Sequence, residues 1–233
     1  MHIPDGYLCP QTWITFYAAM LPIWVWSAIK TRKSLKSKYI PTLAIGSAFS
    51  LILMMFNIPI PGGITGHAIG ATLLSLIFGP YASILIISLT LAIQALLFGD
   101  GGITSFAVNS FIMGYIASFA GYYSYKYIIL LFPVDINSNM LASGIAGYIS
   151  SILASFCTGI ILGIQPILSP TANNMPIYFS HSLEISILSI LIGHILVFGW
   201  IECFVTALAY GFLLKEKSPV LNILKEDTSL EIS

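Results

Sequence analysis

Apolar residues run along this chain in seven stretches that are separated by shorter polar connections. The stretches cover residues 12–29, 40–56, 68–78, 82–98, 104–125, 140–162 and 186–214. A helix that crosses a bilayer needs about 20 mostly apolar residues, so the pattern predicts an all-α, polytopic membrane bundle of about seven transmembrane helices. The third stretch is too short to span upright, and Pro80 would separate it from the fourth because proline cannot continue a helix. We expect a tilted or partly buried helix there.

The composition supports a membrane location. Of the 233 residues, 57% are hydrophobic and only 8% are charged, whereas soluble domains carry about 25% charged residues. The formal net charge is zero, so no basic surface is available to bind nucleic acid. The lipid bilayer is the expected surrounding of this chain.

The positive charges are placed unevenly. Five of the nine lie between Lys30 and Lys38, three lie at or after Lys215, and Lys126 stands apart. With seven spans and the N-terminus outside, all nine fall on the cytoplasmic side, as the positive-inside rule requires. No basic segment precedes the first apolar stretch, so we expect no cleaved signal peptide, an intact N-terminus and a cytoplasmic C-terminus.

The first two residues form a potential chelate. Met1 should be retained, because its removal generally requires a small second residue and His2 is large. The α-amine of Met1, the amide nitrogen of His2 and the imidazole Nδ1 of His2 can close adjacent five- and six-membered rings on one metal ion. A deprotonated amide and an imidazole suit square-planar ions such as nickel and copper.

His67 is the candidate for the fourth nitrogen. It lies on the same predicted face, at the start of a short helix, and it follows a glycine-rich loop that allows close backbone approach. Pro4 fixes its own φ, and Asp5-Gly6 is a turn sequence that could fold the terminus back into the bundle. Taken singly, a histidine at position two is usually a disordered terminus, and a lone histidine near an interface is usually a polar anchor.

Four polar side chains could orient the metal ligands from a second layer. They are Asp5 in the opening segment and Gln94, Asp100 and Asn109 in or beside the connection between the fourth and fifth stretches. Structural roles are open for the same residues, because Asp100 could serve a turn and Asn109 could satisfy backbone groups at a helix start.

Three further residues compete for a functional role. His181 lies in a long loop, and its simplest interpretation is a solvated loop residue. His194 and Glu202 lie inside the last apolar stretch, where ionisable groups are functional candidates. The structural alternative for that pair is a mutual hydrogen bond or another polar contact inside the bundle.

Other motifs are absent or structural. The sequence has no GxxxxGK[ST], HExxH or GxSxG, so no nucleotide site and no intramembrane hydrolase is expected. Small residues recur at every fourth position of the sixth stretch, which lets another backbone approach closely. This stripe, which indicates internal helix packing or docking of a partner subunit, consists of Ser143, Gly147, Ser151, Ser155, Gly159 and Gly163.

The opening residues MHIPDGYL and the region from about Pro59 to Gly114 resemble the CbiM/NikM family. These proteins are nickel/cobalt substrate-binding membrane subunits of energy-coupling-factor transporters. The resemblance implies a single transmembrane substrate-binding domain over residues 1–233, with a chelating segment 1–8 and a cytoplasmic tail from about 215. It implies that Met1, His2 and His67 bind the metal, while the part after about Met140 carries less of the likeness.

The resemblance also implies a cargo and partners. Ni²⁺ or Co²⁺ would be the transported substrate, captured at the outer face of a prokaryotic cell membrane, and planar four-nitrogen geometry favours nickel. A membrane coupling subunit, cytoplasmic ATPase subunits and a small accessory membrane subunit would complete the importer, so this chain would itself be non-catalytic.

Two rival functions remain open from the sequence. A self-contained ion-coupled permease or channel would use His194 and Glu202 as its intramembrane relay. A membrane metalloenzyme would need an open coordination position and a general base, and a filled planar site offers neither.

Overall fold

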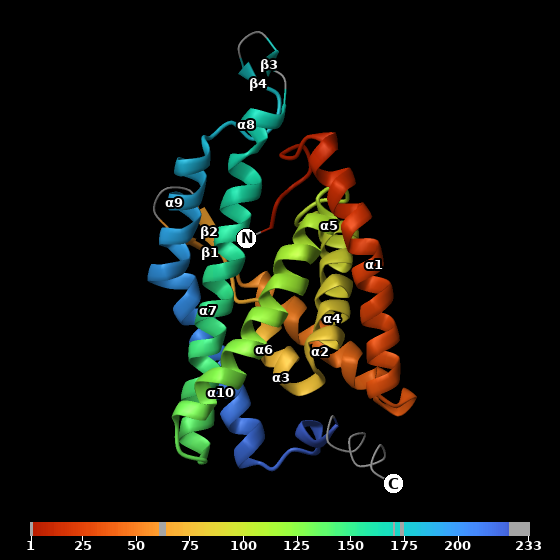
Figure 1. The fold of residues 1–233 in the computed structure, drawn as a ribbon, viewed down its shortest axis with the longest axis vertical. Coiled ribbons are helices and arrows are strands. Elements are labelled where there is room, and N and C mark those ends of the chain that lie inside the picture. Colours follow the sequence, from red (N-terminus) through yellow and green to blue (C-terminus); the bar gives the residue numbers. More distant parts are fainter. Residues whose placement is uncertain (1, 61–63, 170, 173–174, 224–233) are drawn as a thin grey trace.

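The computed structural model describes residues 2–60, 64–169, 171–172 and 175–223 (Figure 1). Within them the α-helices are α1 (Pro10–Ser34), α2 (Ile40–Met55), α3 (Ala71–Phe78), α4 (Pro80–Ile93), α5 (Phe106–Asn109), α6 (Ala117–Ile128), α7 (Ile136–Gly163), α8 (Gln165–Leu168), α9 (Leu183–Gly193) and α10 (Gly199–Lys215). Three wider π-helical turns continue α4, α5 and α9, namely Gln94–Phe98, Ser110–Ile116 and His194–Phe198. Short 3₁₀ turns cover Ser37–Tyr39, Ile129–Leu131 and Pro219–Asn222.

Helices occupy all seven predicted stretches, so the predicted helical bundle is confirmed. Five helical segments are long and apolar enough to cross a membrane within the described residues: Pro10–Ser34, Ser37–Met55, Pro80–Phe98, Ile136–Leu168 and Leu183–Lys215. The third stretch forms only the eight-residue α3, which is almost wholly buried. Of the expected forms, a tilted or partly buried helix, the buried one is observed. Five of the seven predicted spans are long and apolar enough to cross a membrane.

Two antiparallel hairpins were not expected from the sequence. Strands β1 (Ile58–Ile60) and β2 (Ile64–Gly66) pair directly before His67. Strands β3 (Thr171–Ala172) and β4 (Met175–Pro176) form a second ribbon beyond α8. His67 therefore directly follows a β-hairpin, not an irregular loop alone, and lies four residues before α3 begins at Ala71.

Local sequence explains several helix boundaries. Proline stands in the first turn of α1 and opens α4, where its missing N–H is no loss. The break predicted at Pro80 is present, and Gly79, at φ +82°, forms the turn between α3 and α4. Asp135 caps α7, because its carboxylate accepts a hydrogen bond from the Ser138 N–H at 2.8 Å.

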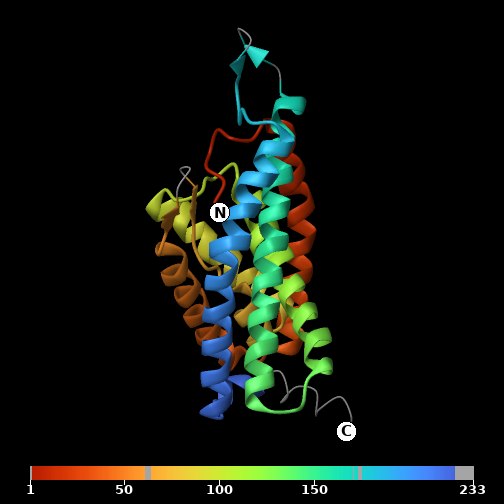
Figure 2. The same cartoon turned by 90° about the vertical axis from the view of Figure 1, so that its left-hand side faces the viewer.

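The helices form two groups that meet around the N-terminal segment. Helix α7 packs against α6, α9 and α10, while α4 packs against α1, α2 and α3. Helix α3 also contacts α6 and so joins the groups. Figures 1 and 2 show the N-terminal end of the described chain between these groups, above the level of α3.

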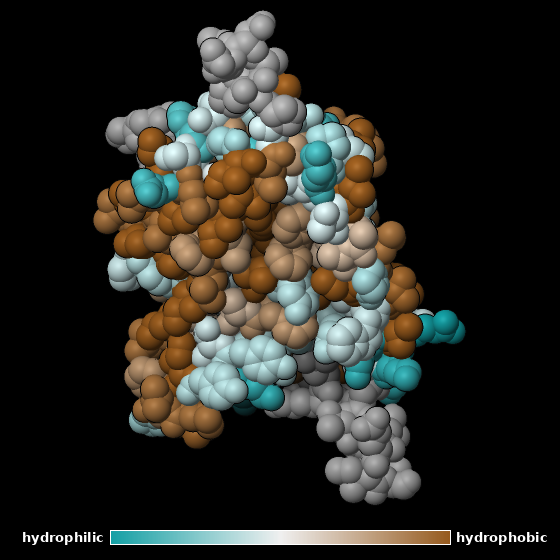
Figure 3. Space-filling view, turned by 45° about the horizontal axis from the view of Figure 1, so that its top comes forward, coloured by the Kyte–Doolittle hydropathy of each residue, from teal (hydrophilic) through white to brown (hydrophobic). Residues whose placement is uncertain are grey.

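Large apolar side chains cover the sides of the bundle. Leu97, Phe212 and Trp26 are 74%, 64% and 57% exposed, and Figure 3 shows brown hydrophobic surface over much of the visible side. Apolar exposure of this extent marks a surface that faces lipid or another protein. It agrees with the membrane location that the composition predicts.

The small-residue stripe of α7 serves internal packing. A Cβ built at Gly159 would lie 2.7 Å from the Cα of Ile187, and one at Gly163 would lie 2.5 Å from the Cα of Leu183, both on α9. At Gly147 the neighbour is Thr206 of α10, at 3.0 Å. Of the two interpretations of the stripe, internal helix packing is the one that these contacts support.

We predict that Gly159→Ala destabilises the bundle, because the added methyl group must push α9 away from α7. The expected cost is about 1–3 kcal/mol, or a fall of several degrees in Tm for a chain of this size. Thermal unfolding in detergent would measure it. Gly114→Ala is the matched control, since its Cβ would meet no atom closer than 3.5 Å; equal Tm values for the two variants would contradict the prediction.

Candidate metal centre

The N-terminal segment enters the bundle with its backbone polar groups satisfied. Ile3 is 1% exposed, and its N–H donates to Asn109 Oδ1 at 3.0 Å. The Ile3 carbonyl accepts hydrogen bonds from Asn109 Nδ2 at 3.0 Å and from the Ser105 hydroxyl. Because a buried backbone group without a partner is costly, Asn109 and Ser105 are what allows this segment to lie inside. Met1, a predicted ligand, lies outside the described residues.

Asp5 fixes the turn that leads out of the bundle. Its carboxylate accepts hydrogen bonds from the N–H groups of Ile103 at 3.0 Å and of Thr104 at 2.8 Å. Burial alone would raise the pKa of Asp5, but the hydrogen bonds from Thr104 and Ile103 outweigh it and lower the pKa. Gly6 adopts φ +84°, so the predicted Asp5-Gly6 turn is present.

The His2 and His67 imidazoles meet inside the bundle. His2 Nδ1 and His67 Nε2 are 3.2 Å apart, and the ring centroids are 4.7 Å apart with an interplanar angle of 29°. His67 is 2% exposed. Two nitrogens that bind one metal ion at about 2 Å and at a right angle lie about 2.8 Å apart, so the observed pair is close to the spacing of two adjacent ligands.

Each ring also has an oxygen partner on its outward side. His2 Nε2 lies 3.2 Å from Gln94 Oε1, and His67 Nδ1 lies 3.1 Å from the Ala68 carbonyl oxygen. Both of those oxygens can accept a hydrogen bond from a ring N–H. The inward nitrogens, His2 Nδ1 and His67 Nε2, face each other at hydrogen-bonding distance.

Asp100 adds negative charge at this position. Its Oδ1 lies 3.3 Å from His2 Nδ1. Burial raises the pKa of Asp100, while the positive N-terminus and the Gly101 N–H act in the opposite direction. Two neighbouring imidazole nitrogens beside a carboxylate form an arrangement that suits a cation.

Both imidazoles are held neutral. Burial, followed by the charge of the N-terminus, lowers the pKa of His2 from 6.5 to about 3, and the Gln94 hydrogen bond only partly offsets this. Burial also lowers the pKa of His67 well below its usual value, with smaller contributions from the N-terminus, His2 and His194. Metal ions require the neutral ring, so the protein presents His2 and His67 in the form that binds.

The predicted second layer of polar residues is brought together. Gln94 and Asp100 contact His2, Asn109 contacts Ile3, and Asp5 holds the turn. Gln94 begins one π-helical turn and Asn109 immediately precedes another; such widened turns are frequent at functional sites. The connection between the fourth and fifth stretches therefore contacts the opening segment directly.

Two residues of this region were missed from the sequence. Ser105 was not singled out, although it lies between the predicted residues Asp100 and Asn109. Gln165 accepts hydrogen bonds at Oε1 from the Cys9 N–H at 2.9 Å and from the Thr12 hydroxyl at 3.2 Å. Phe179 also donates its N–H to the Tyr7 carbonyl at 3.2 Å, so the described part of the 163–182 loop contacts the outer part of the N-terminal segment.

His181, His194 and Glu202, the other functional candidates from the sequence, lie apart from the His2–His67 pair or bond backbone groups. His181 is exposed, as expected for a loop residue. His194 and Glu202 do not bond each other; of the two structural alternatives, another polar contact inside the bundle is the one observed, since His194 Nδ1 bonds the Ile190 carbonyl at 2.8 Å. The two carboxylate oxygens of Glu202 instead accept the N–H groups of Ile69 and Gly70.

Side chains alone do not complete a metal site here. Within the described ranges, no group of three or more His, Cys, Asp and Glu side chains could hold a metal ion. A site built on His2 and His67 would therefore need backbone or terminal nitrogens as further donors.

Residues 2–220 match a family described as the cobalt uptake substrate-specific transmembrane region, CbiM. The chain belongs to the CbiM family. It is 41% identical over 215 residues to a probable fused nickel transport protein of Lactiplantibacillus plantarum, which covers 91% of this chain and 64% of that protein. It is 36% identical to a putative metal transport protein of Methanocaldococcus jannaschii, with 98% of each chain covered.

Two further similarities extend the family membership. A fused nickel transport protein of Rhodobacter capsulatus is 34% identical, with 95% of this chain and 64% of that protein covered. A crystal structure of a truncated transition metal transporter is 46% identical, with a TM-score of 0.87 over 93% of this chain and 99% of that one. This CbiM-family chain thus spans about 64% of the length of the two fused relatives.

We predict that Asn109→Leu releases the opening segment without unfolding the bundle, because the N–H of Ile3 loses its partner and its carbonyl loses one of two. Hydrogen exchange at Ile3 should accelerate by about tenfold or more, because two buried hydrogen bonds are lost and the loss of one alone costs about 1–3 kcal/mol. Asn137→Leu, on the exposed start of α7, is the control. Unchanged exchange in Asn109→Leu would show that other contacts hold the segment.

Proposed function

We propose that this chain is the substrate-capture subunit of an ATP-driven energy-coupling-factor importer. It binds Ni²⁺ or Co²⁺ at the outer face of a prokaryotic cell membrane through the Met1 amine, the amide nitrogen and Nδ1 of His2, and Nε2 of His67. The observation that carries the proposal is the pair of buried imidazole nitrogens, 3.2 Å apart, beside Asp100. Asp5, Gln94, Asp100 and Asn109 support the ligands from outside.

The charge distribution supports the proposed orientation. Basic residues lie in the connection between α1 and α2, in the last turn of α6 and in the last turn of α10. Figure 1 shows these helix ends together at the bottom of the bundle, below the N-terminal segment. That end would face the cytoplasm, and the proposed metal site would then lie nearer the outer side.

The names of the relatives support the class of cargo. The two fused relatives are named as nickel transport proteins, and a putative cobalt transport protein of Archaeoglobus fulgidus is 26% identical. A planar set of four nitrogens, including a deprotonated amide, favours Ni²⁺. Nickel is therefore our first choice of substrate and cobalt the second.

The energy would come from partner proteins. The sequence holds no nucleotide-binding motif, so a membrane coupling subunit and cytoplasmic ATPases would drive uptake. A small accessory membrane subunit is also expected, and this chain itself would perform no catalysis. The permease alternative is less favoured, because the carboxylate oxygens of Glu202 are engaged by backbone N–H groups rather than by His194.

We predict that one extra residue before Met1 abolishes high-affinity Ni²⁺ binding, because it moves the α-amine out of the chelate while every side chain stays intact. His67→Ala should weaken binding by at least about 100-fold, more than the loss of a supporting residue. Calorimetry and the visible absorption of planar Ni²⁺ would measure both. His181→Ala, in the exposed loop, is the control; equal binding by the native and extended chains would exclude the amine as a ligand.

We also predict that binding at pH 6 releases about two protons per Ni²⁺, one from the amine and one from the amide. The lowered pKa values of His2 and His67 leave both rings neutral at this pH, so they release none. Affinity should therefore fall with decreasing pH. Calorimetry in buffers of different ionisation enthalpy counts the protons, and a count near four would mean that both imidazoles are protonated before binding.

A further inference from the structure

Glu202 is a buried carboxylate in the long helical segment formed by α9 and α10. It is 2% exposed. Its Oε2 accepts the Ile69 N–H at 2.6 Å, and its two oxygens lie 3.0 and 3.2 Å from the Gly70 nitrogen. Within the described residues no basic side chain bonds this carboxylate, so two consecutive backbone N–H groups provide its stabilisation.

A carboxylate at this position is expensive to bury, because a charge removed from water needs strong compensating interactions. A charged acceptor also makes stronger hydrogen bonds than a neutral one. The two N–H groups lie at the start of α3, where the helix dipole favours negative charge. Glu202 therefore ties α10 firmly to the beginning of α3.

The tied backbone directly follows His67. Gly70 has φ +76°, a conformation that glycine adopts freely. On the opposite side, the Ser50 hydroxyl of α2 donates to the Ile69 carbonyl at 2.8 Å. Residues 69–70 are thus held between α2 and α10, which leaves His67 little freedom to change its position.

The same helical segment also contacts the residue before His67. A Cβ built at Gly66 would lie 2.5 Å from the Phe198 ring, so that ring lies directly against the Gly66 backbone. Phe198 and Glu202 are one turn apart. Together they bracket His67 on both sides along the chain.

We propose that Glu202 is a positioning residue for the metal ligand His67, and that Phe198 assists it from the other side. This inference rests on the proposed function. Neither side chain binds the ion; they fix the height and direction of the His67 ring opposite His2. Supporting contacts of this kind typically contribute 10–100-fold to metal affinity.

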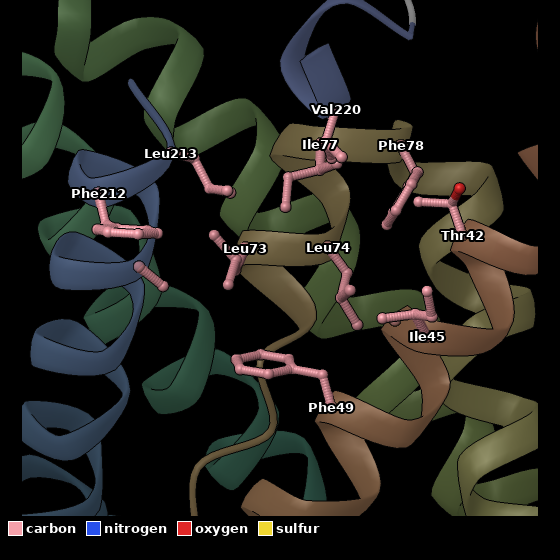
Figure 4. Close-up of a pocket in the computed structure, with 12 residues that line it drawn as sticks. Thr42, Ile45, Phe49, Leu73, Leu74, Ile77, Phe78, Phe212, Leu213 and Val220 are labelled. Carbon is pink, nitrogen blue, oxygen red and sulfur yellow. The ribbon is translucent and has the colours of Figure 1, made fainter. Parts of the chain in front are cut away.

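The contacts of Phe198 and Glu202 with the backbone around His67 also link α10 to the proposed metal site. Further along, an apolar pocket of about 260 Å³ lies between α2, α3 and α10, and Figure 4 shows Leu73, Leu213 and Phe212 around this space. A displacement of α10 relative to α3 at this pocket would therefore be carried to the His67 backbone by the Glu202 hydrogen bonds. This connects ion release to a helix movement rather than to the site alone.

The test uses Ni²⁺ as the probe and the full chain with its native N-terminus. In Glu202→Gln, the amide keeps one acceptor oxygen and turns an NH₂ group toward a backbone N–H, so one hydrogen bond is lost. We expect the Ni²⁺ dissociation rate to rise by about 10–100-fold, with a shifted planar absorption band. Glu184→Gln, at the exposed start of α9, is the control and should behave as the parent protein.

A double variant separates positioning from general destabilisation. If Glu202 acts through His67, then Glu202→Gln should have no further effect on Ni²⁺ binding in the His67→Ala background. Additive losses in the double variant, or unchanged dissociation in Glu202→Gln alone, would overturn the inference. If Glu202→Gln does not fold, Phe198→Leu takes its place with the same two readings.

The outcomes also distinguish this inference from the function beneath it. If the parent protein does not bind Ni²⁺, or if His67→Ala binds as the parent does, the proposed capture function fails. If the parent binds and His67→Ala does not, while Glu202→Gln and Phe198→Leu behave as the parent, only the positioning role fails.

Discussion

The structure depends on one constraint: a polar chain terminus can lie inside an apolar bundle only when its backbone groups find partners there. Asn109 and Ser105 satisfy the N–H and the carbonyl of Ile3, and Asp5 fixes the turn that follows. Without them, the opening segment would remain in water. The predicted metal ligands would then never meet, since His2 reaches His67 only from the buried position.

Once the segment is inside, the chemistry of the two histidines follows from their surroundings. The oxygens of Gln94 and Ala68 lie within hydrogen-bonding distance of the outward ring nitrogens, and burial lowers the pKa values of His2 and His67. The inward nitrogens, His2 Nδ1 and His67 Nε2, lie 3.2 Å apart. Neutral imidazoles are the form that binds a metal ion, and two of them at this spacing are the chemical basis of the proposed capture.

The two helical groups contribute differently to the site. The group around α4 supplies the groups that hold the opening segment, through the π-helical turns at Gln94 and beside Asn109. The segment α9–α10 supplies Phe198 and Glu202, which bracket His67. His2 is therefore held by the group around α4, whereas the backbone after His67 is held from two sides, by Glu202 of α10 and by Ser50 of α2.

The sequence by itself determined the helical stretches, the membrane location, the break at Gly79-Pro80 and the candidate residues His2 and His67, because hydrophobicity, charge and turn chemistry are local properties. It could not determine that Asn109 holds Ile3, 106 positions away, or that Glu202 engages Gly70 rather than His194. Nor did it reveal the hairpin before His67 or the role of Gln165. Those contacts join distant segments whose pairing leaves no periodic signal, so only the packing of the whole bundle decided them.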